Sequence, residues 1–268
     1  MMRTKKDISE ALRKSFDLLG DAARDEGSEW NRLVLTLGLA DEHSGGLEGK
    51  RFLDVGSSVG VMPLAASFFG TQTSQGLDKF IFPDTFENPF RMTPEQFARV
   101  RKLWQENRME VLKHDIADPL PYADGTVDVI TCNALIEHVH GLHKHLFSEF
   151  ARVLAPGGIV IVTTPNIAML LKRLRFFVGR TPLWDFEDYF RSGTEFTGHI
   201  REFTVNECKQ MFVWSGLEPV KVFSRATYFK WKWLRKPQKW IQLVTQGLSF
   251  LSPNFGDLVI AIGRKARE

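Results

Sequence analysis

The feature that most constrains the fold is an apolar run that ends in a carboxylate and then breaks into a glycine-containing loop, residues 51–60. The run predicts a buried strand. Gly56 and Gly60 predict a sharp turn into a helix, because glycine adopts positive φ values and leaves room for a ligand beside the backbone. A dinucleotide-binding loop requires Gly-x-Gly-x-x-Gly, but serine and valine occupy the third and sixth positions counted from Gly56. Asp54, two residues before Gly56, instead suits a ligand with a cationic end.

Strand and helix patterns alternate after this loop, which predicts an α/β fold with a doubly wound, mostly parallel sheet. Helices are expected near residues 61–69, 94–107 and 142–154, and another is expected to follow Thr204. The last two strands are expected to close the sheet as an antiparallel pair, which makes the last strand antiparallel. The seven strand candidates are residues 51–55, 73–77, 110–114, 127–132, 159–164, 218–224 and 258–263.

Composition limits the classes of function. The formal net charge is +3, from 35 Lys and Arg against 32 Asp and Glu, which is too small to argue for a nucleic-acid partner. The two cysteines, Cys132 and Cys208, lack the spacing of a metal site and are typical of a reducing cytoplasm. No run approaches the roughly 20 apolar residues that cross a bilayer. We therefore expect a cytoplasmic protein, at most peripheral to the inner membrane surface.

Basic and aromatic residues concentrate in one late segment. No Asp or Glu occurs between Glu218 and Asp257, and three tryptophans lie among the lysines and arginines there. Basic segments with tryptophan favour contact with a membrane surface, here through residues 228–251. Packing of these tryptophans on the rest of the domain is the alternative.

Polar residues end the first four predicted strands: Asp54, Asp78, Asp115 and Asn133. Parallel sheets bind ligands outside the carboxyl ends of their strands, so these side chains are expected to contribute to one site. Asp78 follows Asp54 by 24 residues (78 − 54), near the offset of a carboxylate that binds ribose hydroxyls. A carboxylate accepts two hydrogen bonds at once, which is what a vicinal diol offers, and Asp115 could accept from an adenine amine.

Five stretches around these residues form a recognisable combination. They read Phe-Leu-Asp-Val-Gly-Ser-Ser-Val-Gly at 52–60, Gly-Leu-Asp at 76–78, Asp-Ile-Ala-Asp-Pro-Leu-Pro at 115–121, Ala-Leu-Ile-Glu-His-Val at 134–139 and Ala-Arg-Val-Leu-Ala-Pro-Gly-Gly at 151–158. Together they resemble the class I S-adenosylmethionine-dependent methyltransferases, which implies a Rossmann-like methyltransferase fold with a seven-stranded sheet. Thr-Thr-Pro-Asn at 163–166 and His-Ile-Arg-Glu-Phe-Thr at 199–204 resemble a bacterial subgroup that methylates small molecules or surface-glycan sugars, a role in polysaccharide biosynthesis.

The resemblance implies S-adenosylmethionine as the cofactor. The residues expected to bind it are Asp54, Gly56, Ser57, Ser58 and Gly60 at its methionine end, Asp78 and Lys79 at its ribose, Asp115 and Ile116 at its adenine, and Asn133 near its sulfonium. Ser58 departs from the pattern, because the family's usual residue there is glycine. A catalytically silent relative, serving as a partner-binding or membrane-docking module, is the alternative.

Methylation of a hydroxyl needs alignment and a base that removes the proton. His138 and His199 are the candidate bases, because histidine titrates near neutral pH. A structural hydrogen bond for the first and loop anchoring for the second are the alternatives. No metal is expected.

A small-molecule or glycan hydroxyl is the expected acceptor, and an aromatic loop at 184–190 could stack on its ring. Residues 133–136 read Asn-Ala-Leu-Ile. Methyltransferases of nucleic-acid base amines resemble one another in Asn/Asp-Pro-Pro-aromatic there, so nucleic acid is not expected. The sequence does not indicate an oligomeric state.

Three regions are expected along the chain. Residues 1–49 form an N-terminal helical extension, and residues 50–165 form the S-adenosylmethionine-binding core. Residues 166–268 supply the acceptor-side cover, the last strands and a basic aromatic helical excursion.

Overall fold

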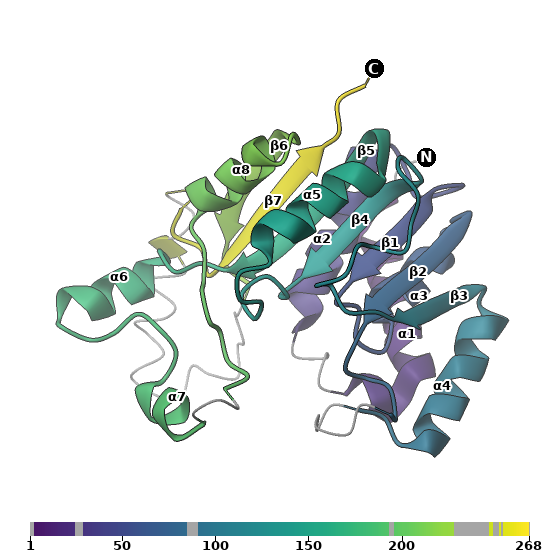
Figure 1. Ribbon diagram of the computed structural model, residues 1–268, viewed down its shortest axis with the longest axis horizontal. Helices are drawn as coiled ribbons and strands as arrows, with labels where there is room; N and C mark the ends of the chain where they lie inside the picture. Colours follow the sequence, from purple (N-terminus) through teal and green to yellow (C-terminus); the bar gives the residue numbers. More distant parts are fainter. Residues whose placement is uncertain are drawn as a thin grey trace.

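The protein is built on one seven-stranded sheet with the order β3-β2-β1-β4-β5-β7-β6 (Figure 1). The computed structural model describes residues 3–24, 29–84, 91–192, 196–227, 247–248, 252 and 254–267. The strands are β1 Arg51–Val55, β2 Thr73–Asp78, β3 Met109–Lys113, β4 Val127–Asn133, β5 Leu154–Pro165, β6 Glu218–Arg225 and β7 Leu258–Arg264. Strand β7 pairs antiparallel with both β5 and β6, and the other pairings are parallel. The predicted fold class is therefore confirmed.

Helices cover both faces of the sheet. They are α1 Lys5–Leu19, α2 Trp30–Ser44, α3 Val61–Ser67, α4 Pro94–Glu106, α5 His143–Val153, α6 Leu170–Phe177, α7 Phe186–Ser192 and α8 Val205–Trp214, with the short 3₁₀ helix η1 Gly20–Ala23. Thr93 and Thr204 start α4 and α8 with capping boxes, in which the threonine side chain accepts from the amide three residues on.

One segment differs from the sequence prediction. The aromatic and acidic residues 184–190, expected as a loop, include the first residues of α7. The reason is local, because the Asp185 carboxylate accepts from the amides of Glu187 (2.9 Å) and Asp188 (3.3 Å) and so satisfies two free donors of the helix start.

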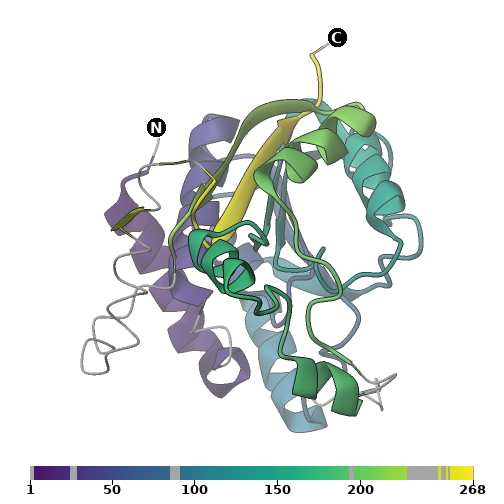
Figure 2. The ribbon, with the colours of Figure 1, turned by 90° about the vertical axis from the view of Figure 1, so that its left-hand side faces the viewer.

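Alternating side chains along the strands divide the interior into two cores. On one face Phe52 packs with residues of the N-terminal helices and of α3 and α4, such as Leu12, Leu37 and Met62. On the other face Leu53 packs with residues of α5 and α8, such as Phe147 and Phe212. Figure 2 shows the sheet between these two layers of helices. The N-terminal helices therefore share a core with the sheet.

Within the residues that the structure describes, no helix is long and apolar enough to cross a membrane. The segment predicted to contact a membrane surface, 228–251, lies outside the described residues except for 247–248.

Candidate functional site

The strand order reverses between β1 and β4, so the carboxyl ends of these neighbouring strands define the switch point of the sheet. Asp54 lies near the end of β1, and Asn133 is the last residue of β4. The Asn133 amide nitrogen is 3.5 Å from Asp54 Oδ1. Two of the polar residues predicted at strand ends therefore meet here.

Asp54 is a buried carboxyl group, with 3% of its surface exposed. Its Oδ1 also accepts a hydrogen bond of 2.6 Å from the Thr131 hydroxyl, one strand away. Burial raises the pKa of Asp54 to about 7, although the donors from Thr131 and Asn133 favour the charged form. A cationic ligand group beside Asp54 would therefore stabilise its ionised form.

The loop after β1 turns through three positive φ values, 74° at Gly56, 47° at Ser58 and 89° at Gly60. Side chains at the two glycines would meet neighbours, because a Cβ on Gly56 would lie 3.2 Å from the Leu135 side chain and one on Gly60 3.0 Å from Val111. Ser58 takes the same left-handed conformation, and its amide donates to Asp78 Oδ2 at 2.9 Å. The serine therefore fits the turn at the position where the resemblance led us to expect glycine.

Ser57 and Gly76 fit against each other beneath this loop. Ser57 is buried, and its hydroxyl has no hydrogen-bond partner among the described residues. A Cβ on Gly76 would lie 2.2 Å from that hydroxyl oxygen. Gly76 therefore leaves the space that Ser57 occupies.

Asp78 organises the loop that follows β2. Its Oδ1 accepts from the amides of Phe80 (2.7 Å) and Ile81 (3.3 Å), and burial raises its pKa even though these amides favour the charged form. Lys79 forms an ion pair with Asp115, whose other oxygen accepts from the Ala117 amide at 3.0 Å. The ion pair therefore connects Lys79, expected at the ribose, to Asp115, expected at the adenine.

Lys79 and the Ala117 amide lower the pKa of Asp115. Ile116, the next residue, is half-buried against the second core. The residues predicted at the adenine therefore combine a charged carboxylate with a partly exposed apolar side chain.

Asn133 forms hydrogen bonds with three elements, and its contact with Asp54 in β1 is the first of them. Its Oδ1 accepts from the hydroxyls of Thr36 in α2 (2.9 Å) and Thr163 in β5 (3.1 Å). The next residue, Ala134, has φ of 46°, a strained value for a residue with a side chain. Thr36 is not among the residues predicted from the sequence, although a threonine within the apolar run 33–39 is a usable signal of a buried polar contact.

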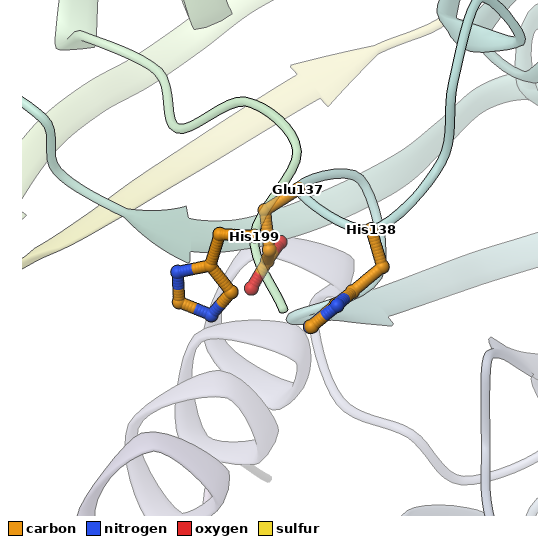
Figure 3. Close-up of side chains that lie close together, drawn as sticks. All are labelled: Glu137, His138 and His199. Atoms are coloured by element: carbon orange, nitrogen blue, oxygen red, sulfur yellow. The ribbon is translucent and has the colours of Figure 1, made fainter. Parts of the chain in front are cut away.

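Beyond β4, the two predicted histidines meet a carboxylate that sequence reasoning missed. One ligand atom from each of Glu137, His138 and His199 lies within 4.8 Å of the others, and the three side chains face one another (Figure 3). The histidine rings are 5.0 Å apart between centroids, at 78°. The backbone produces this meeting, because the amides of Ile200 (2.8 Å) and Arg201 (3.2 Å) donate to the Glu137 carbonyl.

Each histidine is held through its Nδ1 atom. His138 Nδ1 lies 3.1 Å from the Thr197 carbonyl and 3.2 Å from that of Gly198. His199 Nδ1 lies 2.8 Å from Glu202 Oε1, and Glu202 is in turn paired with Lys172. This leaves the Nε2 atom of each ring for a ligand.

Burial shifts the pKa values of two residues of this cluster, Glu137 and His138. Glu137 has none of its surface exposed, and burial raises its pKa to about 7, against the effect of the Thr164 hydroxyl, which donates to its Oε2 at 3.0 Å. Partial burial and the neighbouring His199 lower the pKa of His138. The positive charge of Arg32 in α2 favours the ionised form of Glu137 and also of Asp54.

Known sequences match part of the chain. Residues 90–162 match the family described as a methyltransferase domain. The ubiquinone biosynthesis O-methyltransferase of Escherichia coli O7:K1 is 31% identical over 132 residues, which are 49% of this chain and 50% of that protein. The protein of the same name from Klebsiella pneumoniae is 30% identical over 132 residues, with 49% of each chain covered. The chain thus spans about half the length of the curated relatives it matches.

Solved structures match nearly the whole chain. A chain from the complex of the Haloferax volcanii Trm112 methyltransferase activator with a methyltransferase has a TM-score of 0.60 at 19% identity, covering 96% of this chain and 98% of that one. For the S-adenosylmethionine-dependent methyltransferase of Mesorhizobium loti the TM-score is 0.55 at 18% identity, with 90% and 99% covered. Geranyl diphosphate C-methyltransferase of Streptomyces coelicolor, solved with Mg²⁺, geranyl diphosphate and S-adenosylhomocysteine, has a TM-score of 0.52 at 16% identity, with 93% and 88% covered. The protein therefore has the fold of the class I S-adenosylmethionine-dependent methyltransferases, and its residues 90–162 match their methyltransferase domain family.

Proposed function

We propose that this chain is an S-adenosylmethionine-dependent methyltransferase that acts on a hydroxyl group of a small molecule or sugar. The observation that carries the proposal is that two groups of residues meet at the switch point of the sheet. A positive-φ loop and strand-end carboxylates lie on one side. On the other, Glu137 and His138, which follow β4, meet His199, which follows α7. The names of the sequence relatives, which are O-methyltransferases, support oxygen as the methylated atom.

The residues at the carboxyl ends of β1 to β3 fit this cofactor. The loop backbone can approach a ligand closely, and the buried Asp54 gains a counter-charge from the ammonium of the methionine part. Asp78 and Asp115 remain partly exposed for hydroxyl and amine donors. S-Adenosylmethionine supplies a methyl group already activated on a sulfonium, so the protein has only to align the acceptor and remove its proton.

The cluster of Glu137, His138 and His199 suits the acceptor side of the site. With Nδ1 of each ring held by the protein, Nε2 of His138 or His199 can take the proton of an acceptor hydroxyl. Trp184 packs edge-on against His199, with ring centroids 4.6 Å apart, and is 39% exposed. An exposed indole beside the cluster offers a surface on which a sugar or phenol ring can stack.

Calorimetry with S-adenosylmethionine tests the proposal. The wild-type chain is expected to bind, and Asp78→Asn to bind at least about tenfold more weakly, because a hydrogen bond to a charged group contributes about 1.5–3 kcal/mol. Asp17→Asn, an exposed carboxylate on α1, is the matched control and should bind as wild type. A wild-type chain that binds no cofactor would instead support the catalytically silent module.

The acceptor class is tested by methyl transfer to nucleotide sugars and to phenols, followed as formation of S-adenosylhomocysteine and as added mass on the acceptor. Turnover with sugars alone would support the glycan proposal, and turnover with phenols alone would reject it. Trp184→Ala should raise KM for the acceptor more than it lowers kcat, because stacking binds the ground state and the transition state alike.

We further propose that α6 and α7 contact an anionic membrane surface. These helices lie away from the layered body, beyond the carboxyl end of β5 (Figure 1). Large apolar side chains of these helices and of the segment between them are exposed: Leu174, Phe176, Phe177, Val178, Leu183, Phe186, Tyr189 and Phe190. Residues 170–184 carry four basic side chains and no acidic one, which complements anionic lipid.

Flotation of the full chain with anionic phospholipid vesicles tests this surface. The double variant Phe176→Ser, Phe177→Ser should lose most of the vesicle binding, because its two aromatic rings are 69% and 88% exposed. Trp214→Ser, which removes an exposed aromatic ring from α8, is the control and should float as wild type. Equal flotation of the double variant and the wild type would reject α6 as the docking element.

A further inference from the structure

We propose that Glu137, His138 and His199 form a binding site for a divalent transition-metal ion, and that this ion holds the acceptor hydroxyl. The role at the hydroxyl rests on the proposed function, but metal binding itself does not. The sequence predicts no metal, because methyl transfer does not require one. The structure brings residues 137 and 199 together, which the sequence does not indicate.

The three residues offer a usable ligand set. One carboxylate oxygen and two imidazole nitrogens lie within 4.8 Å of one another. In a tetrahedral zinc site, ligand atoms about 2.1 Å from the metal lie roughly 3.4 Å apart. Side-chain rotations that close the cluster by up to about 1.4 Å would therefore suffice. Two histidines and a glutamate with a fourth position left open is the arrangement of a catalytic zinc site.

A second observation points to a ligand at this position. Glu137 Oε1 is buried and has no hydrogen-bond partner among the described residues, whereas Oε2 accepts from the Thr164 hydroxyl. Leaving such an atom unsatisfied costs about 1–3 kcal/mol, and more if the group is charged. In Figure 3 the Glu137 carboxylate lies close to the two histidine side chains. A cation bound there would satisfy the free oxygen.

The orientation of the histidines also fits. A metal-binding histidine usually donates its second ring nitrogen to a carboxylate or backbone carbonyl, which fixes the ring and raises its basicity. His199 does so with Glu202, and His138 with the carbonyls of Thr197 and Gly198. Both Nε2 atoms are therefore available as ligands, and Glu202 becomes a positioning residue.

The ligand types select the ion. Imidazole nitrogens favour Zn²⁺, Co²⁺, Ni²⁺ and similar ions, whereas Mg²⁺ prefers an all-oxygen shell. Coordination lowers the pKa of a bound hydroxyl, so its proton can leave to solvent water. The oxygen lone pair then forms the new O–C bond as the C–S bond breaks and the sulfur keeps the electron pair. The cation thus replaces direct proton transfer to His138 or His199.

The test uses the full chain, freed of metal with a chelator and titrated with Co²⁺, whose visible absorption reports nitrogen and oxygen ligation. Saturable binding of one Co²⁺, displaced by Zn²⁺ and not by Mg²⁺, is expected. His199→Ala and Glu137→Gln should each weaken binding at least tenfold, and Glu202→Gln about tenfold through the ring it orients. His140→Ala, an exposed histidine nearby in sequence, is the matched control and should leave binding unchanged.

The outcomes separate this inference from the proposed function. Calorimetry with S-adenosylmethionine is run on the same chelated chain. Cofactor binding without Co²⁺ binding overturns the metal site and leaves the proposed function standing. Co²⁺ binding without cofactor binding supports the metal site and overturns the proposed function. Loss of Co²⁺ binding in His140→Ala, or its persistence in His199→Ala, also overturns the site. Should Glu137→Gln fail to fold, His199→Ala carries the test, because its side chain lies on a partly exposed loop.

Discussion

At the scale of single residues, Ser58 shows how a residue with a side chain can take a left-handed conformation in the loop after β1. Its φ of 47° lies in the left-handed region, which costs an ordinary residue about 1–2 kcal/mol. The hydrogen bond from its amide to Asp78 helps to hold that conformation. The serine therefore carries backbone strain, while the path of the loop stays that of a glycine.

Ser58→Gly should leave the free energy of unfolding unchanged or raise it by up to about 1 kcal/mol, because relief of the strain exceeds the added entropy of the unfolded chain. Ser58→Val should lower it by about 1–2 kcal/mol, because a β-branched residue fits positive φ poorly. Urea unfolding of both variants measures the difference. A valine variant as stable as the glycine variant would contradict the strained loop.

Asp54 couples the stability of the free protein to pH. Its folded pKa of about 7 lies above the ordinary value of 3.8. Between these two values the folded state holds a proton that the unfolded state has lost, so stability falls as pH rises and then levels above about pH 7. The shift of about 3 pKa units corresponds to about 4 kcal/mol.

Asp54→Asn should remove this pH dependence, because the amide resembles the protonated carboxyl group. As pH rises from 4 to 7, the stability of the variant should increase relative to that of wild type. At pH 8 the variant should bind S-adenosylmethionine more weakly than wild type. Thermal unfolding across this pH range measures the first effect, and calorimetry measures the second.

Asp128→Asn is the control for the pH measurement. Arg51 lowers the pKa of Asp128 through a hydrogen bond at 2.8 Å, so the stability that Asp128 contributes is present at neutral pH and is lost below its folded pKa. Substitution of Asp128 should therefore destabilise the protein most at neutral pH, opposite to Asp54. Parallel pH profiles for the two variants would reject the assignment.

At the scale of elements, helix α2 belongs to the candidate site although it precedes the first strand. Thr36 binds Asn133 across 97 positions of sequence, and the charge of Arg32 acts on both Asp54 and Glu137. Helix α2 is therefore part of the cofactor and acceptor surroundings in our proposal.

Thr36→Val should lower the free energy of unfolding by about 1 kcal/mol and weaken cofactor binding, because Asn133 loses one of its two donors. Thr36→Ser keeps the hydroxyl group and should retain most of the affinity for S-adenosylmethionine. Loss of affinity in Thr36→Ser with none in Thr36→Val would show that the methyl group of Thr36, and not its hydrogen bond, matters.

At the scale of the whole molecule, α1 and α2 are packed into the same core as the sheet. Leu12 and Leu37 are fully buried in the cluster that also holds Phe52 and Met62. The boundary near residue 49 therefore separates regions of sequence that share one hydrophobic core. We propose that they unfold together.

Leu12→Ala should lower the stability of the whole protein by about 2–5 kcal/mol and keep a single unfolding transition. Arg13→Ala, exposed on the same helix, should change stability by less than about 0.5 kcal/mol. Calorimetric unfolding measures both variants. A Leu12 variant that leaves the main transition in place would instead show that the N-terminal helices fold separately.

Much of the fold could be predicted because its signals are local. Strand β1 has the predicted bounds, and the other strands differ from prediction by a few residues at their ends. Capping residues such as Thr93 and Thr204 mark helix starts through contacts three residues apart. Helix α7 was missed because the Asp185 cap lies within a segment too short and too aromatic for a clear helical period.

The sequence alone determined the order of the strands along the chain and the positions of Asp54, Asp78, Asp115 and Asn133 at strand ends, because these depend on hydrophobic period and glycine turns. Only the tertiary structure decided what those residues touch. Lys79 pairs with Asp115, Thr36 reaches Asn133, and residues 137 and 199 come together across 62 positions (199 − 137). Backbone hydrogen bonds between distant segments, such as Ile200 to Glu137, set these contacts, and no local pattern encodes them.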